Sequence, residues 1–255
     1  VEGARCMIVD STARALLDIA GYYRSKFDVK VVGVTGSVGK TTTKDMIALV
    51  VAQKYKTLKT QGNHNNEIGM PQTLFGLDSS YEAAVIEMGM SHQGEISRMS
   101  MSCQPDVAVI TNIGISHIEN LGTQENILKA KLEILDGAAY DAPLILCRDD
   151  KLLAGVQLHS DRKVYYYSVS KKDCDVYASG VKTVDNSITF TINYEGGKIA
   201  AQINCLGEHN VKNALAAFCV GLALDIPPED IVKGIAQFKP EGLRQNVTVI
   251  DGVTY

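Results

Sequence analysis

The sequence contains no block of basic residues and no long apolar run, and each absence excludes a class of function. Lys and Arg number 25 against 29 Asp and Glu, for a net charge of −4. Proteins whose main role is nucleic-acid binding usually carry a basic patch, so this balance argues against that role. No apolar run approaches the roughly 20 residues that a membrane-spanning helix needs, and no signal peptide is visible. We therefore expect a cytoplasmic protein without a membrane span or a nucleic-acid partner.

The sequence also lacks paired cysteines. None of its six cysteines forms a C-x-x-C motif, and most lie in apolar stretches. Scattered thiols of this kind are typical of a reducing compartment, where they stay free. We expect buried, free thiols at Cys6, Cys103, Cys147, Cys174, Cys205 and Cys219.

The chain is long enough for one large or two modest domains with a hydrophobic core. It has 255 residues, of which 45% are hydrophobic and 21% charged, the balance of an ordinary globular protein. No internal repeat or low-complexity segment is present. The sequence starts at Val1 and stops at Tyr255, just after an expected strand at residues 247–250, so both ends look cut. We interpret the chain as a fragment of a longer protein.

One stretch, VVGVTGSVGKTTTK at residues 31–44, combines a buried apolar strand, a glycine-rich turn and the start of a helix. Glycines let the backbone curl so that several N–H groups face one anion, and the helix N-terminus adds partial positive charge. Lys40 can reach the outer phosphates of a nucleotide, and the Thr41 hydroxyl can ligate Mg²⁺. The predicted phosphate-binding residues are Gly36, Ser37, Gly39, Lys40, Thr41 and Thr42.

The spacing of this stretch departs from the standard phosphate-binding motif G-x-x-x-x-G-K-[ST]. Val34 stands where the first glycine is expected, and the loop reads G-x-x-G-K-T. The alternative to a nucleotide site is an ordinary strand-to-helix turn with a surface lysine. We favour the nucleotide site because strand, glycines, Lys-Thr and helix follow one another in the order that such a site requires.

The first part of the chain alternates buried strands with helices. Expected strands cover residues 31–34, 55–59, 83–87, 106–112 and 144–147, and expected helices begin near residues 12, 40, 71 and 124. Apolar strands separated by helices indicate a parallel α/β sheet. Ligands of such sheets collect at the carboxyl ends of the strands. The glycine loop, Glu87 and the loop after Asn112 all follow strands in this way.

From about residue 164 the pattern changes to alternating apolar and polar residues. Expected strands at 188–194 and 199–205 are joined by Glu-Gly-Gly at 195–197, a hairpin signal. Helical spacing returns at 211–224 and near 231–238. We predict an α/β fold of P-loop type, with a mostly parallel sheet flanked by helices and a small antiparallel subsheet.

Three residues near the strand ends are candidates for metal or phosphate binding. Glu87 ends a buried strand, where an unpaired carboxylate is costly, so it either binds Mg²⁺ beside Thr41 or pairs with a Lys or Arg. His117 lies in a glycine-rich loop, where it either serves a metal or phosphate or is a structural histidine. Lys131 lies on a helix of mixed charge, and the sequence alone predicts that it is solvated.

Amide side chains are dense in the loop QGNHNNEIG at residues 61–69. Asn63 and Asn66 are candidate substrate contacts there, although a turn-forming loop needs Gly and Asn in any case. Asn210 either caps the helix at 211–224 or reads a nucleotide base, with Asn213 one turn further on.

These motifs together resemble the Mur ligases, ATP-dependent amide-bond formers of bacterial cell-wall synthesis. The resemblance covers nearly the whole chain and rests on TGSVGKTT, Gly62-Asn63, Glu87, TNIGISH, Lys131, GEHNVKN and Arg244. The shortened glycine loop is the form that this family uses. Within the family, GNHNNEIGMPQTL, EMGMSHQGEI and KAKLEIL are most similar to members that add D-alanyl-D-alanine to UDP-N-acetylmuramoyl-tripeptide.

The resemblance implies a role for each matching residue. Lys40 and Thr41 would hold the ATP phosphates and a first Mg²⁺, with Glu87 as a ligand of that metal. His117 would serve a second Mg²⁺ site, to which Lys131 would contribute after carbamylation. Because this role needs Lys131 inside the site, the resemblance replaces the solvated interpretation of that lysine. Lys40, His117 and Lys131 would then be the catalytic residues.

The same resemblance places Asn210 and Asn213 near the adenine and Arg244 near the phosphates, although an isolated arginine is otherwise usually solvated. It also implies three regions in the chain. Residues 1–27 would be the remnant of an N-terminal UDP-sugar domain and its connector, 28–240 the central ATP-binding domain, and 241–255 the start of a C-terminal domain. We expect such a fragment to bind ATP but not to complete ligation alone.

The implied chemistry activates a carboxylate that would otherwise have oxide as its leaving group. Attack of the carboxylate on the γ-phosphate of ATP gives an acyl phosphate, and an amine then displaces phosphate. The cofactors would be ATP and two Mg²⁺, which neutralise charge on the transferring phosphoryl group. The expected partners are UDP-N-acetylmuramoyl-tripeptide and D-alanyl-D-alanine, and the expected state is a monomer.

Three alternatives remain at this point. Another Mur-type or folylpolyglutamate-type ligase, adding a different amino acid, would share the motifs. A P-loop nucleotide switch protein is disfavoured because no guanine-reading N-K-x-D signature is present. A carbohydrate kinase or a non-hydrolytic nucleotide-binding module would be favoured if Lys131→Ala left phosphoryl transfer intact.

Overall fold

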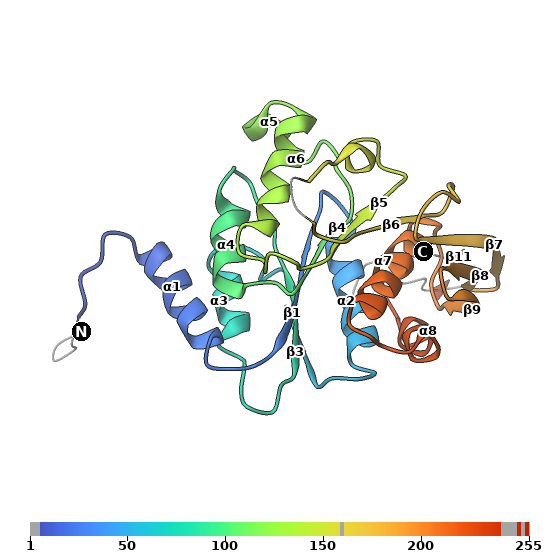
Figure 1. The fold of residues 1–255 in the computed structure, drawn as a ribbon, viewed down its shortest axis with the longest axis horizontal. Helices are drawn as coiled ribbons and strands as arrows, with labels where there is room; N and C mark the ends of the chain where they lie inside the picture. Colours follow the sequence, from blue (N-terminus) through green and yellow to red (C-terminus); the bar gives the residue numbers. More distant parts are fainter. Residues whose placement is uncertain (1–5, 159–160, 241–248, 251–252, 255) are drawn as a thin grey trace.

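The computed structural model of the chain describes residues 6–158, 161–240, 249–250 and 253–254. Most strands form one nine-stranded sheet in the order β2-β3-β1-β4-β5-β6-β7-β8-β9 (Figure 1). These strands are β1 (Lys30–Thr35), β2 (Thr57–Lys59), β3 (Ala83–Glu87), β4 (Val107–Ile110), β5 (Leu144–Cys147), β6 (Val164–Ser168), β7 (Val176–Val184), β8 (Ser187–Tyr194) and β9 (Gly197–Ile203). A separate hairpin pairs β10 (Val249–Ile250) with β11 (Val253–Thr254).

Helices cover both faces of the sheet. They are α1 (Thr12–Arg24), α2 (Lys40–Val51), α3 (Gly69–Leu74), α4 (Glu95–Cys103), α5 (Ile118–Leu121), α6 (Gln124–Leu132), α7 (His209–Ala223) and α8 (Pro228–Ala236), with 3₁₀ turns η1 (Glu133–Leu135) and η2 (Leu153–Gly155). Helices α2, α7 and α8 pack together on one side, and α1, α3 and α4 lie on the other (Figure 1). No helix among these is long and apolar enough to cross a membrane.

Strand β1 is an interior strand of the parallel part, and it is apolar on both faces. Its residues from Val31 to Thr35 are all buried, as expected for a strand covered by helices on each side. It pairs in parallel with β3, where Val34 is opposite Glu87, and with β4, where Thr35 is opposite Ile110. The carboxyl ends of β1, β3 and β4 therefore meet at one edge of the sheet. The predicted α/β fold is confirmed.

The antiparallel part is smaller than the change of pattern at residue 164 suggested. Strand β6 runs parallel to β5, and β7 is parallel to β6 over two residue pairs. Within this sheet the antiparallel pairs are β7 with β8 and β8 with β9. The predicted antiparallel subsheet is present, but β6 belongs to the parallel sheet.

Two local features differ from the sequence-based expectation. Helix α4 was not expected, because Ser100 and Ser102 interrupt its apolar pattern, yet both serines are buried and hydrogen-bonded to main-chain carbonyls. Helix α7 begins at His209 with Glu208 at the N-cap, so the capping role considered for Asn210 is wrong. Asn210 lies inside the first turn.

The regions at the two ends of the chain are only partly tested. Helix α1 packs against α3 and α4, with Leu17 and Ala20 buried in the core. Residues 241–248, which include Arg244, lie outside the described residues. The division of the chain at residues 27 and 240 stays a prediction. Cys103, Cys147, Cys205 and Cys219 are free and buried, as expected, whereas Cys6 is exposed and Cys174 is half-buried, so the expectation of burial is wrong for these two.

Candidate functional site

The glycine loop joins β1 to α2 in a conformation that needs its two glycines. Gly36 has a φ of +150°, and a Cβ placed on it would lie 1.9 Å from Thr111 Oγ1. Gly39 has a φ of +79° and is the N-cap of α2. The Lys40 ammonium folds over the loop and donates to Gly36 O at 3.0 Å and to Ser37 O at 3.5 Å. The loop, the helix N-terminus and the lysine thus face one point, as phosphate binding requires.

The loop that follows β4 lies directly beside the glycine loop. Ser37 N–H donates to Asn112 O at 3.1 Å, and Gly114 N–H donates to Ser37 Oγ at 2.8 Å. Val38 N–H donates to Asn112 Oδ1 at 3.0 Å. The motif TNIGISH therefore contacts the glycine loop through its first residues and ends at His117.

Glu87 at the end of β3 holds a carboxylate in the interior with one oxygen unsatisfied. Its side chain is 1% exposed. Oε1 accepts hydrogen bonds from Thr41 Oγ1 at 3.3 Å and from Asn65 Nδ2 at 2.7 Å. Oε2 has no partner among the described residues. A buried carboxylate oxygen without a donor fits a cation ligand.

Lys131 is buried in α6 at 2% exposure. Burial and then the charge of Lys40 lower the pKa of Lys131 to about 7. Its Nζ makes no hydrogen bond or ion pair within the described part of the chain. The solvated lysine that the helix pattern predicts is therefore wrong, because the folded chain buries this residue, and it lies near enough to Lys40 for that charge to act on it.

His117 lies at the start of α5 in a left-handed backbone conformation with a φ of +64°. Partial desolvation of the imidazole by neighbouring protein atoms lowers the pKa of His117, and the charges of Lys131 and Lys40 lower it further. Glu95 acts in the opposite direction. Because the charges of Lys131 and Lys40 both act on His117, the three side chains lie close enough to interact electrostatically.

The amide-rich loop at residues 61–69 has a functional residue that the sequence analysis missed. Asn65 reaches Glu87, as described above. Asn66 instead accepts from the N–H groups of Ile68 at 3.1 Å and Gly69 at 2.8 Å, which starts α3. Asn63 is exposed. Three asparagines in one loop look alike in the sequence, and only the path of the backbone separates their roles.

Asn210 and Asn213 lie at the start of α7, next to the glycine loop. Asn213 Oδ1 accepts from Thr43 Oγ1 at 3.0 Å, and its Nδ2 donates to Asn210 Oδ1 at 3.1 Å. Asn210 Nδ2 donates in turn to Leu206 O at 2.7 Å. This chain of amides joins α7 to α2 just behind Gly39. Thr42 is half-buried on the same turn of α2.

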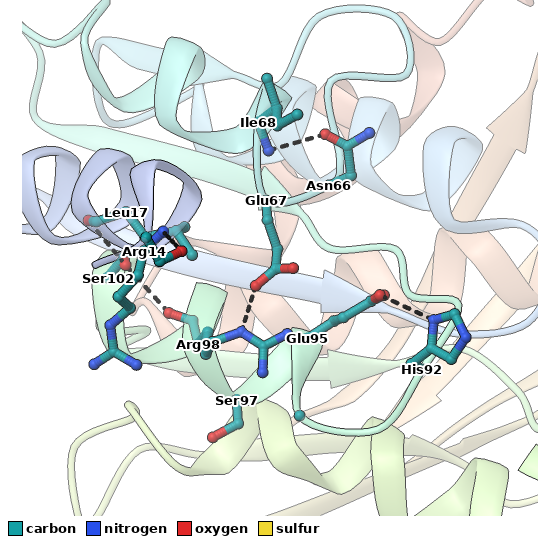
Figure 2. A network of polar contacts seen from close by, with 12 residues as sticks. Arg14, Leu17, Asn66, Glu67, Ile68, His92, Glu95, Ser97, Arg98 and Ser102 are labelled. Carbon is teal, nitrogen blue, oxygen red and sulfur yellow. Dashed lines mark hydrogen bonds and ion pairs between the residues drawn. The ribbon is translucent and has the colours of Figure 1, made fainter. Parts of the chain in front are cut away.

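Carboxylates around α4 form a second set that the sequence analysis did not single out. Figure 2 shows Arg98 paired with Glu67, and Glu95 facing His92. Glu133 accepts from Gly94 N–H through both oxygens, at 2.8 and 2.9 Å, at the N-terminus of α4. Lys131 lies two residues before Glu133 in the chain, at the end of α6, so this network adjoins the lysine in the sequence.

A metal at this site would have to bind to mixed donors. No group of three or more His, Cys, Asp or Glu side chains comes together among the described residues. The Thr41 hydroxyl contacts Glu87 Oε1, so this hydroxyl and Glu87 Oε2, which has no partner among the described residues, are two oxygen donors that lie close together. Two protein oxygens with phosphates and water are a typical environment for Mg²⁺, so the residues present fit this ion.

Comparison with known proteins agrees with this arrangement. A curated UDP-N-acetylmuramoyl-tripeptide--D-alanyl-D-alanine ligase from Bacillus subtilis (strain 168) is 41% identical over 250 residues, which are 98% of this chain and 53% of that protein. A crystal structure of MurF from Acinetobacter baumannii superimposes with a TM-score of 0.91 at 34% identity, covering 97% of this chain and 55% of the other. The MurF ligase of Thermotoga maritima in complex with ADP has a TM-score of 0.89 at 28% identity, covering 100% and 58%.

The chain spans about half the length of the curated relatives it matches. The profile of the Mur ligase middle domain matches residues 34–221, from the end of β1 into α7. That range contains the glycine loop, Glu87, His117 and Lys131. With its fold, its strand-end site and this match in agreement, the chain belongs to the Mur ligase family.

Proposed function

We propose that this chain is the ATP-binding part of an ATP-dependent ligase that joins D-alanyl-D-alanine to UDP-N-acetylmuramoyl-tripeptide in peptidoglycan precursor synthesis. The observation that supports it best is the buried Lys131, whose pKa is lowered to about 7 beside the glycine loop. A buried cation next to Lys40 is unfavourable, whereas a neutral amine can react with CO₂ and release a proton to give an anionic carbamate. This change would turn Lys131 into a partner for cations.

The nucleotide is proposed to be ATP. The glycine loop and the N-terminus of α2 would receive its phosphates, with Lys40 turned from the loop carbonyls to the outer phosphates. Asn210 and Asn213 would lie on the adenine side, and Arg244 near the phosphates. The relative from Thermotoga maritima in complex with ADP supports this assignment.

Two Mg²⁺ sites complete the proposal. Glu87 and Thr41 would hold one ion, and His117 with carbamylated Lys131 would hold the other. Bound Mg²⁺ would neutralise the charge that develops on the transferring phosphoryl group. The protein's own task is to orient the γ-phosphate towards the substrate carboxylate and away from water.

The reaction would proceed through an acyl phosphate. The terminal carboxylate of the tripeptide attacks the γ-phosphate and releases ADP, and the amine of D-alanyl-D-alanine then displaces phosphate to form the amide. Asn63 and Asn66 remain candidate contacts of the peptide substrate. Regions outside residues 28–240 would bind the UDP-sugar and the amine, so we expect the chain alone to bind ATP without completing ligation. A cytoplasmic monomer is part of the same proposal.

The experiment that tests this function has two parts. Isothermal titration of the chain with ADP, with and without Mg²⁺, tests the nucleotide site; absence of binding in both conditions would contradict it. A substrate screen on the full-length enzyme then pairs UDP-muramoyl peptides with candidate amines. Turnover with a single amino acid but not with D-alanyl-D-alanine would favour another Mur-type or folylpolyglutamate-type ligase.

A further inference from the structure

Asn112, just after β4, binds both main-chain polar groups of one residue in the glycine loop. Its Oδ1 accepts from Val38 N–H at 3.0 Å, and its Nδ2 donates to Val38 O at 2.8 Å. Both lengths lie within the ordinary range of N–H···O hydrogen bonds. The Asn112 side chain therefore fixes the orientation of the peptide groups on either side of Val38.

The surrounding contacts reinforce this clamp. Thr111 Oγ1 also donates to Val38 O, at 2.8 Å. Ser37 is held on both sides, through its N–H to Asn112 O and through its hydroxyl, which accepts from Gly114 N–H. Residues 111–114 thus form a platform under the two central residues of the loop.

The composition of the loop explains why it needs an external platform. Val34 is a strand residue where a standard phosphate-binding loop has its first glycine, and Val38 is a β-branched residue that is 63% exposed at the tip. Its hydrophobic side chain makes little contact that could hold the tip in place. Because Asn112 binds the N–H and the C=O of Val38, the two peptide groups at the tip of the loop cannot rotate freely.

We propose that Asn112 is the positioning residue of the nucleotide loop, which sets its affinity for the phosphates without touching them. By holding Val38, it leaves the N–H groups at the start of α2, which have no partner within the helix, and the Lys40 ammonium as the phosphate-binding groups. The inference rests on the proposed ATP site and deepens it. It goes beyond the motif residues, because Asn112 itself carries no charge and binds no phosphate.

The test compares Asn112→Ala and Asn112→Asp with the wild-type chain in ADP titrations with Mg²⁺. Removal of both bonds in Asn112→Ala should weaken binding about tenfold, as loss of a hydrogen-bonded anchor predicts. Asn112→Asp keeps an acceptor for Val38 N–H but places a carboxylate oxygen against Val38 O. It should therefore bind weakly at neutral pH and recover towards wild type as the pH falls and a protonated carboxyl can donate to Val38 O.

The pH series is read as the ratio of variant to wild-type affinity. Asp150, which binds Ile113 N–H, and Tyr167, which donates to Thr111 O, flank the platform in every variant. Lys40, His117 and Lys131 are likewise present in every variant, and Asn112→Ala, which adds no charge, serves as the reference for their contribution. A ratio that recovers in Asn112→Asp but stays flat in Asn112→Ala is the signature of the lost donor.

Amide hydrogen exchange at Val38 gives a readout that does not depend on the nucleotide. It should accelerate in Asn112→Ala while the thermal unfolding midpoint changes little. The matched control is Asn204→Ala, which removes a comparable amide bond to Ala236 O at 2.6 Å away from the loop and should leave both readouts unchanged.

Three results would overturn the inference. If the wild-type chain binds ADP and Asn112→Ala binds it equally tightly, the role given to Asn112 is refuted, but the proposed nucleotide site is not. Unchanged exchange at Val38 in both variants refutes the clamp. Failure of the wild-type chain to bind ADP refutes the proposed nucleotide site and this inference together.

Discussion

One oxygen of Glu87 accepts a hydrogen bond from Asn65 Nδ2 at 2.7 Å, and the other oxygen has no partner among the described residues. The bond to Asn65 orients the carboxylate so that Oε2 is the oxygen available to a cation. Groups that orient a metal ligand typically change metal affinity by 10- to 100-fold when they are removed. The neighbouring Asn66 has no such contact, which provides an internal comparison.

We predict that Asn65→Ala lowers the affinity for Mg²⁺, measured in the presence of ADP, by about tenfold. Asn66→Ala should leave that affinity unchanged. It should instead lower the free energy of unfolding by about 1 kcal/mol, because the first turn of α3 loses its side-chain acceptor. Mg²⁺ titrations at constant ADP and urea unfolding measure the two effects. Equal Mg²⁺ dependence in wild type and Asn65→Ala would contradict the role given to Asn65.

The lowered pKa of Lys131 predicts a specific dependence of stability on pH. Its pKa is about 7 in the folded chain and near 10.5 when unfolded. Between these values the unfolded state binds more protons, so stability should rise with pH from about 7 towards 10, by at most about 1.4 kcal/mol per pH unit from this group. Below pH 7 both states are protonated and the contribution to the slope vanishes.

Urea unfolding at a series of pH values, in buffer freed of CO₂, measures this slope. Lys131→Met keeps a long apolar side chain in the same space and removes the titrating group, so its stability should lack the rise. Lys129→Met, at an exposed position two residues earlier on the same helix, is the control and should keep the rise. A wild-type slope equal to that of Lys131→Met would show that Lys131 is not buried as a neutral amine.

The glycine loop should not tolerate a side chain at Gly36. A Cβ there would lie 1.9 Å from Thr111 Oγ1, and the φ of +150° is unfavourable for other residues. We expect Gly36→Ala to abolish measurable ADP binding and to destabilise the chain by about 2 kcal/mol. Gly155→Ala is the matched control, because nothing lies within 4 Å of a Cβ at that position. ADP titration and thermal unfolding of both variants test the difference, and normal ADP binding by Gly36→Ala would exclude the predicted steric conflict.

Much of the parallel fold and the nucleotide loop follows from local sequence patterns. Apolar runs bounded by glycine and polar residues identify β1, β3 and β5, and a carboxylate at the end of a strand, such as Glu87, is visible without coordinates. The order of the strands in the sheet cannot be read from the sequence, because it depends on which strands pair. In a parallel sheet, however, the carboxyl ends of the strands lie at one edge whatever their order.

The parts that could not be predicted depend on packing between distant elements. Lys131 looks like a surface lysine, because its burial depends on how α6 packs against neighbouring elements such as α4 and α5. Helix α4 was missed because its inward face includes serines, whose hydroxyls find main-chain partners only in the folded state. The roles of Asn65 and Asn112 depend on which loops lie side by side, and a single sequence does not contain that information.

Glu133 should stabilise the region around Lys131 by closing the N-terminus of α4. Its carboxylate accepts from Gly94 N–H through both oxygens and from Ser97 N–H at 3.2 Å. These N–H groups lie at the positive end of the helix dipole and have no partner within the helix. Glu133→Ala should therefore lower the free energy of unfolding by about 1–2 kcal/mol, and Glu133→Gln, which keeps one acceptor oxygen, should lose less.

A free energy of unfolding in urea that increases from Glu133→Ala to Glu133→Gln to wild type distinguishes capping from simple loss of packing. The fold should survive in both variants, because Ser100 Oγ still joins α4 to Ile134 O at 2.6 Å. Glu195→Ala, at an exposed position in the β8–β9 hairpin, removes the same charge without a cap and should change stability little. If Glu133→Gln were as unstable as Glu133→Ala, the charge of the carboxylate rather than its hydrogen bonds would be the source of the stabilisation. If both variants were as stable as Glu195→Ala, Glu133 would have no capping role at α4.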